Sequence, residues 1–488
     1  MVDASTLPIW LTALAAVLLT AAALCIAIVA SAKADWRPAG GLLLLAVSPT
    51  VPHVPVTFGL SLDDILPLVA VVLLALGVLR DRAAVRDAWR LIGSKTVRGL
   101  AVLAAEAIVF VVGAAAFSSV ANASGPADAF RLFARSGVRY LLMAVIVVLA
   151  VLANPPRRRM ALLTHAIALV GAAEATFGVI AYVLPLPGRM GLELARKNSV
   201  LYENVPGRVA GTIGLSPDFL GALFLFTVPL TVALALESGS RRDRVFWWAA
   251  AGVQALALGL TFARVSLVLV AAEVVVLMLW RGRMRYIVPL GACLLPVAIF
   301  TPAIRRISDD VPDRLALWTS GFRMMIDHPF FGVGSGNMVA VELAQPARYG
   351  HTAFGAAEVN AHNTLLLAGA ELGTMGFVAA VLLNVALAVL AARMLWLCFR
   401  DKRQLAPAAA SLAVLAFLVQ GMVNDLFTVA VVGTLAAVVI GGFLVVDPDE
   451  LPAAIPEGGG QGQTEGENKV SLGRRVRQAV RSLRAARI

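Results

Sequence analysis

Apolar residues run in stretches of about 20 along most of this chain, with short polar segments between them. Such a stretch is long enough to cross the hydrocarbon core of a bilayer as one helix. The predicted helices are roughly 8–32, 39–58, 63–80, 98–120, 128–153, 160–185, 211–236, 245–262, 264–280, 286–303, 362–399, 407–423 and 426–446. The pattern therefore predicts an all-α polytopic membrane protein with about 12–13 transmembrane helices.

Basic residues fall in alternate loops between these helices, such as Arg80 to Arg98, Arg157 to Arg159 and Arg400 to Arg403. By the positive-inside rule these loops face the cytoplasm, which leaves 186–210 and 304–361 as the long external segments. We therefore attribute the net charge of +11 to membrane topology rather than to binding of nucleic acid.

Composition and spacing divide the chain into three parts: a transmembrane domain over 1–446, a flexible Gly- and Glu-rich linker over 447–469, and a basic tail over 470–488. Apolar residues recur at helical spacing between the arginines of the tail, so the tail is expected to lie on anionic lipid at the cytoplasmic surface. The first apolar stretch lacks a basic n-region and an evident cleavage site, and it is expected to be retained. All 3 cysteines lie in apolar stretches, so neither a disulfide framework, a metal site nor a cofactor is predicted.

Three polar residues from distant segments are predicted to reach the external face of the membrane. Arg208 precedes one helix, Arg264 lies in a tight connection between two helices, and His362 opens the helix that follows the external loop. Arginine binds phosphate through a fork of donors, and histidine removes a proton near neutral pH. The three residues suit an anionic headgroup and a hydroxyl that must be deprotonated, although each one alone is also explained by membrane anchoring or helix capping.

The external loop and the helix after it contain further polar signals. The stretch "DDVPDRLALWTSGFRMMID" predicts an amphipathic helix with an apolar stripe of Leu315, Trp318, Phe322 and Met325 that packs on the membrane or on other helices. "HPFFGVGSGN" then predicts a tight glycine-rich turn without the ending of a phosphate-binding loop, and its His328 is interpreted as structural. Asn360 or Asn363 is expected to cap the next helix. Glu371 is expected to be a buried carboxylate bonded to a neighbouring helix.

These stretches, in this order, resemble the O-antigen ligase and polymerase superfamily of bacterial membrane glycosyltransferases. The matching stretches are "GRVAGTIGLSPDFLGALF", "LTFARVSLVL", "DRLALWTSGFRMMIDHPFFGVGSGN" and "AHNTLLLAGAELGTMG". The resemblance implies transfer of a glycan from undecaprenyl pyrophosphate to an acceptor sugar hydroxyl, without a metal or nucleotide, at the external face of the bacterial plasma membrane. The implied partners are the lipid-linked donor, a glycan or glycolipid acceptor, and membrane lipids, with no nucleic acid.

The resemblance also implies roles for particular residues. Arg208 and Arg264 would hold the pyrophosphate, and His362 would activate the acceptor hydroxyl. Arg314 would contact the donor or fix the loop, and Asn363 is expected at the substrate-binding site. At one position the chain departs from the pattern of the family, because Asp218 follows the proline where Asn is more usual.

One feature outside the resemblance is a run of arginines in "DAFRLFARSGVRYLLMAV". Arg131, Arg135 and Arg139 are spaced four residues apart, which places them along one stripe of a straight helix. One interpretation is membrane anchoring with a buried ion pair to Glu106 or Glu174. The other is that Arg135 and Arg139 line the access groove of the donor and bind it.

Three alternatives remain open at this level. A polymerase of lipid-linked repeats would differ from a ligase only in its acceptor. A secondary transporter would need polar residues along a path through the membrane midplane, and often an internal repeat. A membrane scaffold without enzymatic activity is the third.

Overall fold

The computed structural model describes residues 37–48, 55–57, 60–80, 95–152, 156–183, 208–209, 211, 216–282, 307–349, 361–401, 404–427 and 430–445. The predicted helices 8–32 and 286–303, the linker and the basic tail lie outside the described residues. The helices are α2 (Arg37–Val47), α3 (Leu62–Arg80), α5 (Lys95–Ala121), α6 (Pro126–Leu152), α7 (Pro156–Val183), α9 (Pro217–Glu237), α10 (Arg241–Thr261), α11 (Arg264–Trp280), α14 (Ile307–Asp327), α15 (Met338–Ala344), α16 (Pro346–Tyr349), α17 (Thr364–Arg400), α18 (Leu405–Gly421) and α19 (Ala430–Val439), and α19 continues as a π-helix over Ile440–Leu444.

The predicted all-α class is confirmed, and most predicted helices match within a few residues. The predicted helix 39–58 is wrong. α2 ends at Val47, and two short antiparallel strands follow, β1 (Pro55–Thr57) and β2 (Leu60–Ser61). Three prolines at 49, 52 and 55 explain the difference, because proline lacks the N–H that a helix interior requires.

Four described helices are long and apolar enough to cross a membrane alone: Val102–Ala121, Arg159–Ile180, Pro217–Glu237 and Thr364–Arg400. α6 makes a fifth when its two halves, bent by 52°, are taken as one span. Shorter apolar helices are Pro67–Val78, Leu405–Gly421 and Val432–Leu444. The chain is therefore a polytopic membrane protein, and the full count of 12–13 spans stays a prediction.

α9 lies at the centre of the described helices. It contacts α7, α10, α11, α18 and α19, and 89% of its apolar window is buried. A helix that is hydrophobic on all sides is expected in such a position, because no face has to meet water. Polar side chains beside it are paired: Gln254 of α10 accepts a hydrogen bond from Thr227 at 2.7 Å and donates one to Thr231 at 2.9 Å. Such pairing removes the cost of a lone polar group in hydrocarbon.

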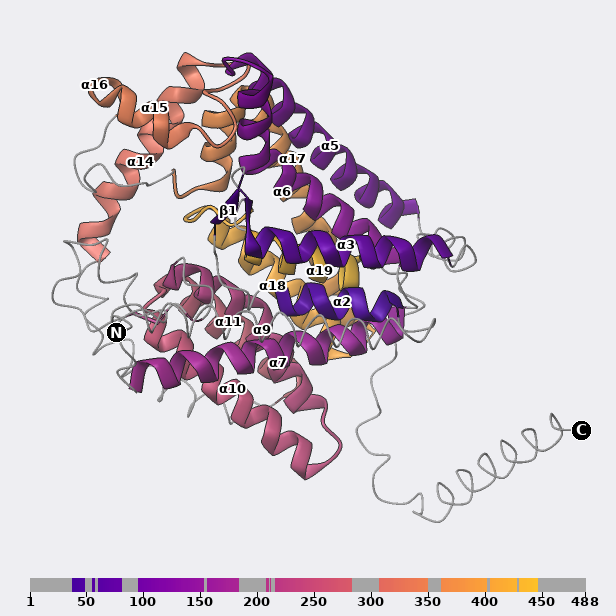
Figure 1. Ribbon diagram of the computed structural model, residues 1–488. Helices are drawn as coiled ribbons and strands as arrows, with labels where there is room; N and C mark the ends of the chain where they lie inside the picture. The colour runs from indigo at the N-terminus through magenta and orange to yellow at the C-terminus, as the bar shows by residue number, and fades with distance from the viewer. Residues whose placement is uncertain are drawn as a thin grey trace, which may run out of the picture. The chain divides into compact units, whose positions relative to one another are not determined.

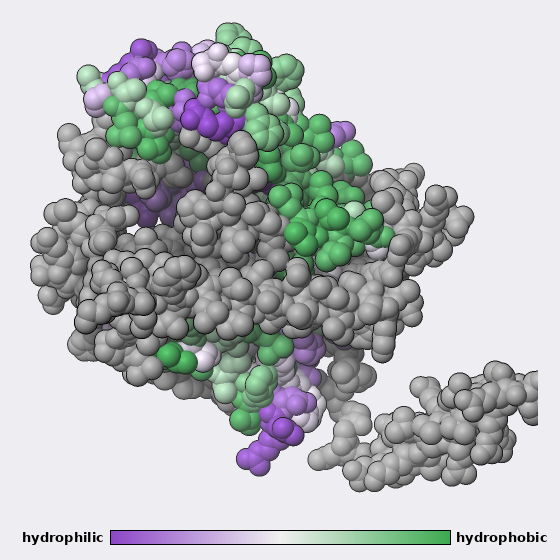
Figure 2. Space-filling model, in the orientation of Figure 1, coloured by the Kyte–Doolittle hydropathy of each residue, from purple (hydrophilic) through white to green (hydrophobic). Residues whose placement is uncertain are grey.

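α17 lies alongside α5 and is covered at its first half by α14 (Figure 1). Figure 2 shows hydrophobic residues over the face where α5 lies and hydrophilic residues gathered toward α15 and α16. α14 packs on α17, and its fully buried Met324 belongs to one apolar cluster with Leu367 and Ala370 of α17. Two members of the predicted apolar stripe, Leu315 and Phe322, are 58% and 48% exposed, whereas a third, Met325, lies against Gly369 of α17. The stripe is thus divided between α17 and the outer surface of the described residues.

α17 is broken at Gly373, which has φ 76° and ψ −168°. The break interrupts the helical hydrogen bonds, and the segment after α14 replaces them. The Thr374 N–H donates to the Pro329 carbonyl at 2.7 Å, and the Ala370 carbonyl accepts from the Val333 N–H at 2.8 Å. A broken membrane helix is tolerated where its freed backbone groups find partners in the protein, as they do here.

Glu371 extends this contact between the broken helix and the glycine-rich turn 328–336. Its carbonyl accepts from the Gly334 N–H at 3.2 Å and from the Ser118 hydroxyl at 2.7 Å. Its buried carboxylate accepts from the Gly336 N–H at 2.8 Å. Glu371 is thus buried as predicted, and its carboxylate binds this turn.

We predict that Gly373→Ala destabilises the protein by about 1–3 kcal/mol. A Cβ at this position would lie 2.7 Å from the backbone of Phe330, and the positive φ disfavours any L side chain. Gly252→Ala in α10 is the control, because its Cβ would meet no atom within 4 Å. Thermal unfolding of the detergent-purified protein measures both, and equal midpoints for the two variants would contradict the close approach.

Candidate functional site

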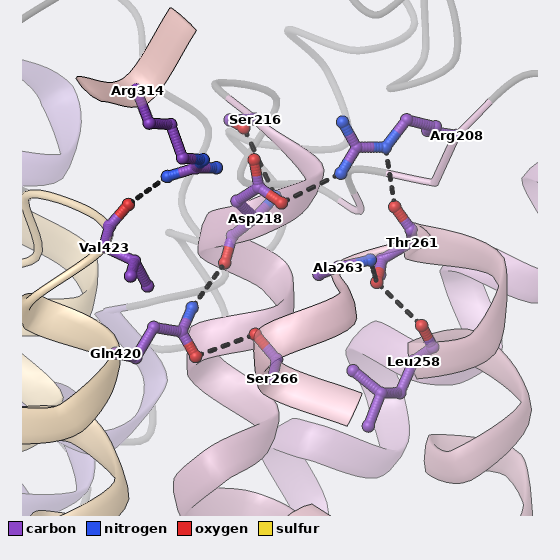
Figure 3. Close-up of polar contacts among 10 residues, drawn as sticks. All are labelled: Arg208, Ser216, Asp218, Leu258, Thr261, Ala263, Ser266, Arg314, Gln420 and Val423. Atoms are coloured by element: carbon purple, nitrogen blue, oxygen red, sulfur yellow. Dashed lines mark hydrogen bonds and ion pairs between the residues drawn. The ribbon is translucent and has the colours of Figure 1, made fainter. Parts of the chain in front are cut away.

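The first turn of α9 carries an acidic residue that is paired with one of the predicted arginines. Ser216 caps the helix and accepts a hydrogen bond from the Asp218 N–H at 3.2 Å. The Asp218 carboxylate then accepts from Nη2 of Arg208 at 2.9 Å (Figure 3). The two side chains are only 29% and 13% exposed, so this ion pair is shielded from water more than an ordinary surface pair.

A second acceptor fixes the orientation of the Arg208 guanidinium. Its Nε donates to the Thr261 carbonyl at 2.8 Å, at the last residue of α10. The neighbouring Val209 N–H donates to the Leu260 carbonyl at 3.0 Å. Carbonyls at a helix C-terminus lack partners within their own helix and carry partial negative charge, so a cationic side chain is well placed there.

The connection from α10 to α11 places the backbone of the second predicted arginine close to the end of α10. α10 ends at Thr261 and α11 begins at Arg264, with only Phe262 and Ala263 between them. Phe262 takes the left-handed conformation (φ 53°), and the Thr261 hydroxyl accepts from the Ala263 N–H at 3.1 Å. The predicted tight connection is confirmed, and Arg264 starts its helix three residues after the carbonyl that binds Arg208.

Gln420, which sequence reasoning did not select, joins three helices beneath this pair. It is fully buried near the end of α18. Its side chain accepts from the Ser266 hydroxyl of α11 at 2.8 Å and donates to the Asp218 carbonyl of α9 at 3.5 Å (Figure 3). The sequence does contain one indication of this role, because Gln420 is a glutamine inside an otherwise apolar helix. Such a residue needs hydrogen-bond partners on other helices.

The turn 422–424, directly after α18, receives two more of the predicted residues. Arg314 of α14 donates to the Val423 carbonyl (Figure 3). Asn363 donates through Nδ2 to the Met422 carbonyl at 2.8 Å. The carbonyls that follow a helix are again the acceptors, and the turn therefore connects α14, α17 and α18.

His362 precedes the first turn of α17 and is half-buried, with φ 45°. The next residue, Asn363, is the N-cap, and its Oδ1 accepts from the N–H groups of Leu365 and Leu366 at 3.0 and 3.1 Å. Capping by Asn363 is thus confirmed. Because these bonds and the one to Met422 occupy its amide, the structure gives Asn363 a part in fixing the backbone beside His362.

The Asp218 carboxylate is paired with Arg208, and the charges of Arg314 and His362 also act on it. We call these four residues the Asp218 cluster. They come from the segment before α9, from α9 itself, from α14 and from the start of α17. The structure thus gathers residues from four parts of the sequence, with Arg264 close along the chain to the Thr261 carbonyl that binds Arg208.

The predicted arginine stripe of α6 is altered by the 52° bend between Pro126–Ala134 and Ser136–Leu152. Arg131 lies before the bend, is exposed, and pairs with Asp128 at 2.5 Å. Arg139 lies after the bend and is half-buried, and the side chain of Arg135 is outside the described residues. Arg131 and Arg139 therefore lie on opposite sides of the bend and not along one straight helix.

The part of α6 after the bend lies against the glycine-rich turn and the end of α18. The hydroxyls of Ser136 and Ser335 are hydrogen-bonded to each other. Tyr140 is buried where the charges of Asp425 and Glu371 act on it. Asp425 belongs to the same connection as turn 422–424. The segment of α6 that contains Arg139 is thus close to the glycine-rich turn and to the connection after α18, which binds Arg314.

The described residues form no evident metal site. Within the ranges that the structure describes, no group of three His, Cys, Asp or Glu side chains is arranged to hold a metal ion. The cationic groups that the structure does gather are arginines and a histidine, which suit an anion and proton transfer.

Comparison with known proteins gives one family. Residues 249–381 match the family model described as O-Antigen ligase. The matched segment runs from α10 through α11, α14 and the glycine-rich turn into α17, so it contains Arg264, Arg314, His362 and Asn363. No curated protein matches the chain.

We predict that Asn363→Ala lowers the stability of the protein by about 1–2 kcal/mol, because the first turn of α17 loses its cap. Asn363→Asp keeps both acceptor bonds to the helix N–H groups and loses only the donor to Met422. We therefore expect Asp to restore most of the lost stability, measured by thermal unfolding. Equal losses in the two variants would show that the cap contributes little.

Proposed function

We propose that this chain, which carries an O-antigen ligase domain over residues 249–381, is a glycosyltransferase of the bacterial plasma membrane. It moves a glycan from an undecaprenyl-pyrophosphate donor to a sugar hydroxyl of a glycan or glycolipid acceptor, with its active site on the external face. The observation that carries this proposal is the Asp218 cluster, where Arg208 pairs with Asp218 at the start of α9 and the charges of Arg314 and His362 act on the same carboxylate.

The reaction requires one proton acceptor and a place for developing negative charge. The acceptor oxygen forms a bond to the anomeric carbon of the donor glycan, and the bond from that carbon to the pyrophosphate oxygen breaks. An imidazole nitrogen of His362 takes the hydroxyl proton, acting as general base. Undecaprenyl pyrophosphate leaves with the bonding electrons, and no metal or cofactor is needed in this scheme.

Arginines supply the charge stabilisation. Arg208 and Arg264 hold the pyrophosphate, and their fixed positive charge stabilises the leaving group as the glycosidic bond breaks. Arg208 is pre-oriented by the Thr261 carbonyl, so its guanidinium needs little reorientation when the anion binds. Arg314 contacts the donor and fixes α14 to the turn after α18. Asn363 supports the site by holding the backbone beside His362.

An apolar groove along α5 suits the polyprenyl chain of the donor. It has a volume of ≈ 680 Å³, and its lining includes Phe110 and Phe117 of α5 with Phe330, Phe331 and Met375 beside the break in α17. An extended hydrocarbon chain can pack against such a surface through van der Waals contacts. We therefore propose that the polyprenyl chain of the donor lies in this groove, next to the glycine-rich turn 328–336.

A polymerase of lipid-linked repeats remains the alternative within the same superfamily, because both reactions use the same donor chemistry. Purified protein in liposomes with a lipid-linked oligosaccharide tests the proposal. Transfer onto a second class of acceptor identifies a ligase, and lengthening of the lipid-linked glycan itself identifies a polymerase. Consumption of no donor under any acceptor condition would contradict both.

His362→Ala is expected to fold normally and to lose transfer by ~10²–10⁴, since the general base is removed. His328→Ala is the matched control, because His328 lies in the same external segment but is not part of the Asp218 cluster. Initial rates with saturating donor measure the effect. Turnover near the wild-type rate in a well-folded His362→Ala protein would remove the catalytic assignment.

Transfer should survive treatment with EDTA. The sequence offers no cluster with metal-ligand spacing, and the proposed scheme neutralises the pyrophosphate with arginines. The rate is measured before and after chelation, with Mg²⁺ and Mn²⁺ added back afterwards. Activity that disappears with EDTA and returns with either ion would replace this scheme with a metal-dependent one.

Arg139→Ala and Arg135→Ala are expected to raise the apparent KM for the lipid-linked donor severalfold, with a smaller effect on kcat. The reason is that both arginines are proposed to line the path by which the anionic donor reaches Arg208 and Arg264. Arg131→Ala is the control, since Arg131 pairs with Asp128 at an exposed position before the bend of α6. Unchanged donor dependence in both variants would end this role.

A further inference from the structure

The Asp218 carboxylate occupies a place that an anionic substrate group would also seek. It accepts a hydrogen bond from Nη2 of Arg208 at 2.9 Å, and the charges of Arg314 and His362 act on it as well. A phosphate that uses the same guanidinium donor must therefore displace the carboxylate or bind directly beside it. Two anions so close repel each other, because water screens them incompletely in a half-buried site.

Asp218 is also held in place independently of Arg208. Its N–H donates to the Ser216 hydroxyl at 3.2 Å, and its carbonyl accepts from Gln420 at 3.5 Å. Gln420 in turn is bonded to Ser266 of α11 at 2.8 Å (Figure 3). The backbone of Asp218 therefore stays in position when its side chain loses Arg208, and the carboxylate remains near the arginine to compete for it.

We propose that Asp218 is an internal counter-ion that weakens binding of the pyrophosphate group and thereby speeds its release. This inference rests on the proposed function. Donor binding exchanges the Asp218 carboxylate for phosphate oxygens at Arg208. After glycan transfer the carboxylate returns to Arg208 and displaces undecaprenyl pyrophosphate. The residue thus sets affinity for the shared pyrophosphate group of donor and product rather than taking part in bond making.

Binding of undecaprenyl pyrophosphate to the purified full-length protein in lipid nanodiscs tests this inference without any transfer reaction. Asp218→Asn removes the charge but keeps an oxygen that accepts from Arg208, so the arginine stays oriented. We expect this variant to bind undecaprenyl pyrophosphate about tenfold more tightly than the wild type at moderate salt. Asp218→Glu keeps the charge and should not tighten binding.

Glu237→Gln is the matched control. Glu237 is the last residue of the same helix, and it also pairs with an arginine, Arg281, at 3.4 Å. It lies 19 residues from Asp218, or roughly 28 Å along α9, so its charge is screened from the cluster. We expect its removal to change affinity less than twofold. An equal gain in Asp218→Asn and Glu237→Gln would reflect net charge alone and overturn the inference.

Steady-state kinetics provide a second readout that a merely structural role would not give. Asp218→Asn should lower the KM for the lipid-linked donor, lower kcat, and strengthen inhibition by undecaprenyl pyrophosphate about tenfold. If Asp218→Asn does not fold, Asp218→Ser is tested in its place. Serine also removes the charge, and it is a small residue that is tolerated at the start of a helix. Unchanged or weaker binding in a folded variant overturns the inference while the proposed function stands. A wild type that neither binds undecaprenyl pyrophosphate nor transfers glycan overturns both.

Discussion

The site depends on the backbone carbonyls at the C-terminal ends of helices, which have no hydrogen-bond partner within their own helix. An α-helix cannot satisfy its last carbonyls internally, and in a membrane protein water is scarce, so side chains must supply the donors. At the end of α10 the Thr261 carbonyl accepts from Arg208, and after α18 the Val423 carbonyl accepts from Arg314. The same hydrogen bonds that satisfy the helix ends therefore collect fixed positive charge at one place.

The break in α17 adds a second constraint. The first half of this helix starts with the Asn363 cap beside His362 and ends at Gly373, where its backbone binds the glycine-rich turn. That half is thus held at both ends, by turn 422–424 at its start and by residues 329–336 at the break. The proposed general base, His362, would gain from such support, because proton transfer requires the imidazole to stay within hydrogen-bond reach of its substrate.

The sequence predicted much of this arrangement because hydrophobic periodicity and charged loops depend on local composition. The bounds of α11 and the two-residue connection before it were predicted closely. The break at Gly373 was missed, since a single glycine inside an apolar run does not distinguish a helix interior from a break. The bend in α6 was also missed, and it separates Arg131 from Arg139, which spacing alone had placed along one straight helix.

The sequence was enough to select the arginines and the histidine of the site, but it did not predict which residues they contact. Arginine and histidine at external helix ends could be selected from the sequence, because charge near a membrane is costly and needs an explanation. Gln420 and turn 422–424 could not, since their roles depend on which helices pack together. Asp218 was noted only as a departure from a pattern, and its position against Arg208 emerged from the packing of α9 beside the end of α10.

A structure of the protein in a lipid nanodisc with bound undecaprenyl pyrophosphate would show whether the arginines bind the pyrophosphate group. We predict that phosphate oxygens lie within hydrogen-bond distance, ~2.7–3.2 Å, of the Arg208 and Arg264 guanidinium groups. We also predict that His362 faces the pyrophosphate from the start of α17. Pyrophosphate bound at another part of the protein, with Arg208 still paired to Asp218, would contradict the proposed site.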